Sequence, residues 1–99
     1  MRIISRKRLK DFWESTQGTG SESPLRAWFS EAVQADWKNP HDIRKQYPTS
    51  SILKRGRVVF NIGGNRFRLV VAVRYDFQIV YIRFIGTHRQ YDRIDAEAV

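Results

Sequence analysis

Four arginines interrupt the apolar, strand-like part of this sequence, and they are its strongest candidates for binding a charged ligand. They are Arg57, Arg66, Arg68 and Arg83. A guanidinium offers paired planar donors that fit phosphate oxygens, and it stays charged at every relevant pH. No acidic residue lies between positions 51 and 75, although a face that needs only solubility usually carries both signs. As a group these residues indicate a surface that holds a polyanion, whereas any one of them alone could be an ordinary solvated arginine.

The segment after the last strand-like run supplies the best candidate for proton transfer. His88 stands there, and imidazole is the side chain best able to exchange a proton near neutral pH. Tyr91 follows three residues later and shares a helical face with His88 if a turn forms. We therefore predict His88 as a catalytic residue with Tyr91 beside it. A surface histidine and a tyrosine packed in the core are the alternative interpretations.

Metal and cofactor chemistry find little support in the sequence. It has no cysteine and two histidines that are far apart, so it lacks the ligands of a zinc site. Most carboxylates fall in the predicted helices and near the C-terminal residues, so the sequence predicts no cluster of carboxylates that could bind magnesium. Gly63-Gly64 fits neither the P-loop nor the dinucleotide-binding fingerprint. We predict that the protein uses no metal and no cofactor.

Length and charge fit a small nucleic-acid-binding protein. The 99 residues suffice for one domain, residues 1–99, with a single small core. The net charge is +8, and nine positive against two negative residues fall within positions 52–93. Such a field attracts phosphates, and it would attract an acidic protein equally. No stretch resembles a secretory signal or approaches the ~20 apolar residues of a membrane span, so we expect a cytoplasmic protein with no membrane partner.

The elements that must position these residues are helices in the first half of the chain and strands in the second. Ser23-Pro24 and Asn39-Pro40 each place a capping residue before a proline. These signals predict helices over residues 24–38 and 39–47, after an earlier one over 5–15. Apolar side chains recur at helical spacing in the two longer helices, so we expect the three tryptophans to pack in the core.

From Ser51 onward the apolar period changes from 3.6 to 2, which is typical of strands. Gly63-Gly64 predicts a tight hairpin, and Asp76-Phe77 predicts a second reversal. We therefore predict an α+β fold with an antiparallel sheet of three or four strands, the fourth supplied by Ile3-Ile4. The N-terminal helices would pack on one face of this sheet and leave a basic open face.

The hairpin register decides whether the arginines meet. Two-residue loops would pair Phe60 with Phe67 and Leu69 with Phe84, which leaves one face of the sheet wholly apolar. Because side chains alternate across a strand, the same register collects the arginines on the opposite face. Other residues expected on that face are Asn61, Tyr81 and Ile85.

Several short motifs of the chain occur with the same order and spacing in a known family. They are Phe60-Asn61-Ile62-Gly63-Gly64-Asn65, Arg68-Leu69-Val70, Tyr81-Ile82-Arg83 and Thr87-His88-x-x-Tyr91-Asp92. With these motifs the sequence resembles the HigB-type toxins of bacterial type II toxin–antitoxin systems, within the RelE-like superfamily. The resemblance extends over essentially the full chain.

The resemblance implies a RelE-like fold and a metal-independent endoribonuclease that cuts mRNA, typically on the ribosome. In such cleavage the ribose 2′-oxygen attacks the adjacent phosphate and leaves a cyclic phosphate and a 5′-hydroxyl. The resemblance assigns Arg68 and Arg83 to the charge that develops on the phosphorane. It assigns His88 to proton transfer and Tyr91 to substrate orientation. The residues it assigns to RNA binding are Lys54, Arg57, Asn61 and Arg66.

The resemblance also implies a co-encoded antitoxin with a helix-turn-helix domain. The antitoxin would neutralise the toxin, and operator DNA would be bound only through the antitoxin. Two surfaces are candidates for the contact: the helical face around Arg26 and Lys38, and the basic sheet face.

Two other functions would use the same basic face. One is a non-catalytic nucleic-acid-binding module, and the other is an interaction domain for an acidic protein. Phe60 and Phe67 point to the core in the predicted register, so they do not form the exposed stacking pair of an RNA-recognition motif.

Overall fold

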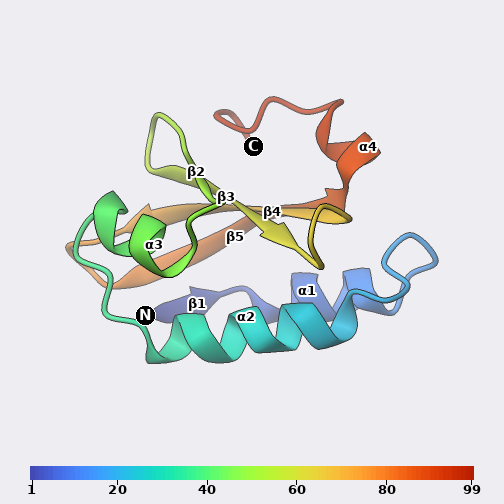
Figure 1. Ribbon diagram of the computed structural model, residues 1–99, viewed down its shortest axis with the longest axis horizontal. Coiled ribbons are helices and arrows are strands. Elements are labelled where there is room, and N and C mark those ends of the chain that lie inside the picture. Colours follow the sequence, from blue (N-terminus) through green and yellow to red (C-terminus); the bar gives the residue numbers. More distant parts are fainter.

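A computed structural model describes residues 1–99 and shows one sheet with its two longest helices on the same side (Figure 1). The strand order is β1-β5-β4-β3-β2, with β1 parallel to β5 and the other neighbours antiparallel. The predicted α+β fold is confirmed, but the sheet is mixed and has five strands. None of the helices has the length and apolar character needed to span a membrane. The elements are β1 (Arg2–Ile4), α1 (Arg6–Trp13), α2 (Glu22–Gln34), α3 (Pro40–Gln46), β2 (Ser51–Ile52), β3 (Arg57–Ile62), β4 (Phe67–Arg74), β5 (Ile79–Thr87) and α4 (His88–Tyr91).

Helices α1 and α2 cover one face of the sheet, below it in Figure 1, and the core lies between these two layers. Its 15 buried residues come from the first three helices, from Trp37 in the loop between α2 and α3, and from alternate positions of the strands. The ring of Phe60 lies 5.3 Å from that of Trp28 and 6.0 Å from that of Trp37. Core packing is confirmed for these two tryptophans, whereas Trp13 is only half-buried.

The start signals of α2 and α3 behave differently in the structure. Asn39 caps α3 as predicted, because its side-chain oxygen accepts the main-chain N–H of Asp42 at 3.0 Å. Helix α2 begins at Glu22, two residues before Pro24, and it ends at Gln34 rather than near residue 38. Proline is tolerated here because the N–H groups of a first helical turn have no partner within the helix.

The β3–β4 turn is centred one residue later than the sequence predicts. Phe60 pairs with Leu69 rather than with Phe67, because Gly64 and Asn65 form the centre of the turn. Gly63 and Gly64 both have a positive φ, of 61° and 69°, a conformation that glycine adopts without steric cost. The correction moves each pairing by two residues, so every side chain on these strands keeps its predicted face.

The β4–β5 pairing follows the predicted register only over the first half of β5, from Ile79 to Ile82. Leu69 lies opposite Ile85 rather than Phe84, because Arg83 is the extra residue of a β-bulge. Beyond the bulge the alternation of β5 is reversed. Ile85 therefore joins the core side and Phe84 the side of the arginines, which corrects the predicted placement of both residues.

Candidate functional site

The sheet face opposite α1 and α2, which we call the basic face, carries most of the predicted site residues. Strands β3, β4 and β5 contribute three cross-strand rows to it. The first row is Arg57, Ala72 and Tyr81, the second is Val59, Val70 and Phe84, and the third is Asn61, Arg68 and Gly86. Since the middle row is apolar, the charged side chains form two groups instead of one continuous patch.

Arg57 and Arg83, which we call the arginine pair, converge on a single oxygen atom. Arg57 donates to the main-chain oxygen of Val99 from Nε at 3.0 Å and from Nη2 at 2.6 Å. Arg83 donates to the same oxygen from Nε at 3.1 Å. Two guanidinium groups that are far apart in sequence thus meet in space. They grip this oxygen with the kind of N–H contacts that arginines make to phosphate oxygens.

The C-terminal segment, residues 95–99, lies over the basic face (Figure 1). The side chain of Glu97 accepts a hydrogen bond from the main-chain N–H of Lys54 at 3.0 Å, and Val99 accepts hydrogen bonds from the arginine pair. The two valines of the middle row are at most 3% exposed, so the face is covered where the sequence predicts it to be open. Sequence analysis missed this cover because the segment has no apolar period. Its two acidic residues, which follow strongly basic strands, are the available signal.

At the other end of the basic face, Arg68 and Asn61 are direct partners across β3 and β4. Arg68 uses only Nη1 within the chain, donating to the carbonyls of Asn65 at 3.1 Å and Phe67 at 3.3 Å. Its Nε and Nη2 have no partner. Asn61 donates from Nδ2 to the carbonyl of Thr49 at 3.2 Å, which leaves its Oδ1 free. Arg68 is therefore held in place while two of its nitrogens can still bind a ligand.

His88 is the first residue of α4, which rises from this end of the sheet on the side away from α1 and α2 (Figure 1). Thr87 caps the helix through reciprocal bonds with Gln90, so the predicted helical turn is confirmed. His88 Nδ1 lies 3.2 Å from Asp92 Oδ2. With Nδ1 facing the carboxylate, Nε2 is the nitrogen free to exchange a proton with a ligand. Sequence analysis missed Asp92, although its four-residue spacing from His88 is a helical pairing signal.

The remaining predicted residues lie in different environments. Tyr91 is half-buried and its hydroxyl has no hydrogen-bond partner within the chain, and Lys54 is exposed beyond the end of β2. Arg66 lies in the β3–β4 turn and donates from Nη2 to the carbonyl of Thr19 at 3.2 Å. It points toward the loop between α1 and α2 because the turn is centred later than predicted. Its predicted placement on the sheet face beside Arg68 is therefore wrong.

The two groups on the basic face lie at different distances from the imidazole. Gly86, the partner of Arg68, precedes His88 by two residues, or about 7 Å of extended strand. Arg83 precedes His88 by five residues, or roughly 16 Å. Along β5, the strand position paired with Arg68 is therefore closer to His88 than the position of Arg83 is. We call the nearer group the histidine end, made of Asn61, Arg68, His88 and Tyr91.

Comparison with known proteins decides the family. A family model, HigB_toxin, described as the RelE-like toxic component of a toxin–antitoxin system, matches residues 21–94. This chain belongs to the HigB toxin family. It is 33% identical over 94 residues to the mRNA interferase toxin HigB of Escherichia coli strain K12, which is 93% of this chain and 88% of that protein. The mRNA interferase HigB proteins of Escherichia coli O157:H7 and Shigella flexneri match with the same identity and coverage.

Membership in the HigB family confirms the resemblance drawn from the motifs. It makes this chain the toxic component of a two-part system, whose other part is an antitoxin. The arginine pair and the histidine end lie within the residues that the family model matches, and the C-terminal segment lies outside them. The cover over the arginine pair is therefore a feature of this chain that the family match does not include.

Proposed function

We propose that this chain is an endoribonuclease that cleaves mRNA through attack of the ribose 2′-oxygen on the adjacent phosphate. The observation that carries the proposal is a protein oxygen held by three N–H contacts from the arginine pair, on the same face as an imidazole with a free Nε2. The names of the HigB relatives, which call them mRNA interferases, support the choice of substrate.

The arginine pair would hold a phosphate that is not the one cleaved. A phosphate oxygen in place of the Val99 main-chain oxygen would accept the same bonds, since phosphate oxygens are favoured partners of guanidinium groups. Because Arg83 lies roughly 16 Å along the strand from His88, we assign it with Arg57 to a neighbouring phosphate. This assignment replaces the expectation that Arg83 stabilises the phosphorane itself.

The histidine end would carry out the reaction. As the 2′-oxygen bonds to phosphorus, its proton leaves, negative charge grows on the phosphoryl oxygens, and the bond from phosphorus to the 5′-oxygen breaks. His88 Nε2 would exchange protons with the reacting oxygens, and Nε and Nη2 of Arg68, which have no partner within the chain, would stabilise the phosphorane. Tyr91 would orient the substrate with its unpaired hydroxyl. The 5′-oxygen takes up a proton as it leaves, which balances the proton lost from the 2′-hydroxyl, and the products are a 2′,3′-cyclic phosphate and a 5′-hydroxyl.

We further propose that the mRNA is presented by the ribosome, and that the antitoxin is a helix-turn-helix protein that carries the complex to operator DNA. The first part is supported by the C-terminal segment, which partly covers the basic face. An mRNA that the ribosome already holds in place would displace this segment more easily than free RNA would. Cleavage of a message with and without ribosomes tests this part. A mobility-shift assay with operator DNA and each protein alone, or both, tests the second.

The experiment that tests the nuclease is induction of the chain in bacteria, with the 5′ ends of messages mapped for the wild type, His88→Ala and His41→Ala. His41 is the other histidine, exposed on α3, and serves as the matched control. General acid–base catalysis contributes about 10²–10⁴-fold, so His88→Ala should remove new 5′-hydroxyl ends and growth arrest, whereas His41→Ala should keep both. Unchanged cleavage by a folded His88→Ala variant would rule out this site.

A non-catalytic RNA-binding module is the second candidate, because the bulge at Arg83 places Phe84 on the basic face with Tyr81. Both rings are half-buried and could stack a base. The two candidates differ in a simple way. A binding module would show RNA affinity and no cleavage products with the wild type, and Phe84→Ala would lower that affinity.

A further inference from the structure

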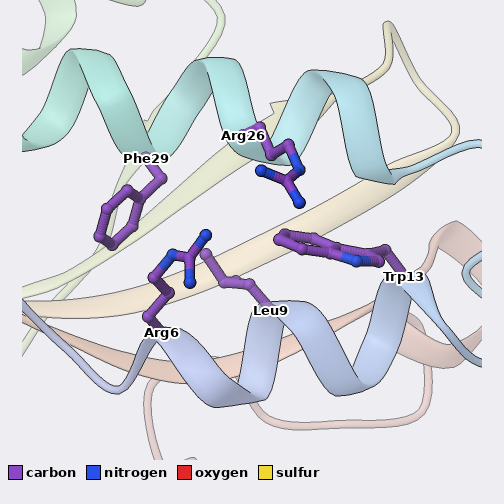
Figure 2. Close-up of a pocket in the computed structure, with 5 residues that line it drawn as sticks. All are labelled: Arg6, Leu9, Trp13, Arg26 and Phe29. Carbon is purple, nitrogen blue, oxygen red and sulfur yellow. The ribbon is translucent and has the colours of Figure 1, made fainter.

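A pocket of about 180 Å³ lies between α1 and α2, on the opposite side of the sheet from the basic face. Figure 2 shows its five lining residues pointing toward one another from the two helices. Helix α1 contributes Arg6, Leu9 and Trp13, and α2 contributes Arg26 and Phe29. None of these residues belongs to the arginine pair or to the histidine end. The pocket therefore needs an explanation other than RNA cleavage.

The two arginines of the pocket are held by aromatic rings. The guanidinium carbon of Arg6 lies 5.3 Å from the ring centre of Phe29, and that of Arg26 lies 5.0 Å from the ring centre of Trp13. Arg6 makes no hydrogen bond within the chain, and Arg26 makes one, to the exposed Glu22 at 2.8 Å. These cation–π contacts attract the guanidinium groups to the rings and leave most of their N–H donors available.

This combination of groups selects a ligand that is both acidic and apolar. Cavities of about 150 Å³ with apolar walls accommodate a benzene ring, so this pocket has room for one large apolar side chain. Stacked arginines at its rim suit carboxylates beside that side chain. Val33, one turn beyond Phe29 on α2, is 43% exposed and extends the apolar surface. A phosphate backbone would satisfy the arginines but not the apolar walls, which disfavours RNA.

We infer that this pocket is a docking site for the antitoxin, which inserts an apolar side chain between α1 and α2 and pairs flanking carboxylates with Arg6 and Arg26. The inference rests on the family assignment, which supplies an antitoxin, and on charge complementarity with this strongly basic chain. It favours the helical face over the basic face for this contact. Antitoxin binding and RNA cleavage then depend on different residues, and mutation can separate them.

Charge reversal at Arg6 tests the inference without threatening the fold. Arg6 is the first residue of α1, whose first turn holds no acidic side chain, so a glutamate there suits the helix dipole. Lys7→Glu is the matched control. It makes the same charge change in the same turn, at a side chain that is 81% exposed and paired only with Asp11.

The measurement is the Kd of the purified antitoxin for these variants by titration calorimetry, with His88→Ala in every chain so that the toxin can be produced. Arg6→Glu should weaken binding by roughly tenfold or more, and adding Arg26→Glu should weaken it further. Phe29→Ala should weaken it through lost apolar contact. Lys7→Glu should stay within about threefold of the wild type, since exposed pairs contribute little.

A growth assay with active toxin completes the test. Arg6→Glu should still arrest growth but resist rescue by the antitoxin, whereas Lys7→Glu should be rescued. Unchanged antitoxin affinity in the double variant overturns the inference. So does a loss of RNA binding without a change in antitoxin affinity, or self-association of the wild type that Phe29→Ala abolishes. If the wild type cuts no RNA, the proposed nuclease fails, and the Kd comparison still decides the docking site.

Discussion

Two pairs of arginines on opposite sides of one sheet differ in what holds them. Arg6 and Arg26 make cation–π contacts with aromatic rings beside an apolar pocket, whereas Arg57 and Arg83 donate hydrogen bonds to one shared main-chain oxygen, that of Val99. The charge is the same in both places. The neighbours decide the ligand: rings and a cavity favour an acidic segment with an apolar side chain, and converging N–H groups favour a phosphate oxygen.

The largest effect should come from Arg68→Ala, because this residue acts beside His88. Loss of a preorganised charge stabiliser costs about 10²–10³-fold in kcat, so we expect at least about a hundredfold loss in mRNA cleavage. Arg66→Ala is the control, two residues away in sequence and directed at the α1–α2 loop. Single-turnover cleavage assays on both variants make the comparison. Equal losses of cleavage in the two variants would contradict a specific catalytic role for Arg68.

Next in size should be the effect of removing either member of the arginine pair. Arg57→Ala and Arg83→Ala should each raise KM by roughly tenfold and leave kcat nearly unchanged, since a phosphate contact is lost in the ground state and the transition state alike. Each should also lower the salt dependence of RNA binding by about one phosphate contact. Antitoxin affinity should not change. A fall in kcat equal to that of Arg68→Ala would indicate that the arginine pair acts on the cleaved phosphate together with the histidine end.

The smallest effect should follow from deletion of residues 95–99. The deletion removes the main-chain oxygen of Val99, which competes for the arginine pair, and the two acidic side chains of the segment. RNA binding should therefore tighten, by about threefold to tenfold, since a hydrogen bond to a charged group contributes about 1.5–3 kcal/mol before the cost of ordering is subtracted. Fluorescence anisotropy with labelled RNA measures this change. Weaker binding after deletion would indicate that the segment helps to hold RNA.

Most of the fold could be predicted from the sequence because the alternation of side chains survives small errors. The β3–β4 turn is centred one residue late, yet Arg57, Asn61 and Arg68 still face the predicted side. The bulge at Arg83 could not be foreseen, because an extra residue leaves no mark in the apolar pattern.

The candidate site was only partly predictable, because local sequence patterns report some of its contacts and not others. His88 at a helix start and the convergence of the arginine pair follow from local patterns and register. The C-terminal cover and the pocket around Arg6 and Arg26 depend on contacts between segments that are far apart in sequence. Charged helix residues of this kind are expected to face water, and no periodic pattern marks the ones that stack on a ring.

The chemistry of the cut RNA ends tests the central claim most directly. A defined message, cleaved by the purified chain on ribosomes with and without a chelator, would be analysed by mass spectrometry. We predict a 2′,3′-cyclic phosphate on one fragment and a 5′-hydroxyl on the other, in equal yield with the chelator, and their absence with His88→Ala. Fragments ending in a 3′-hydroxyl and a 5′-phosphate, or equal cleavage by His88→Ala, would contradict attack by the 2′-oxygen at the histidine end.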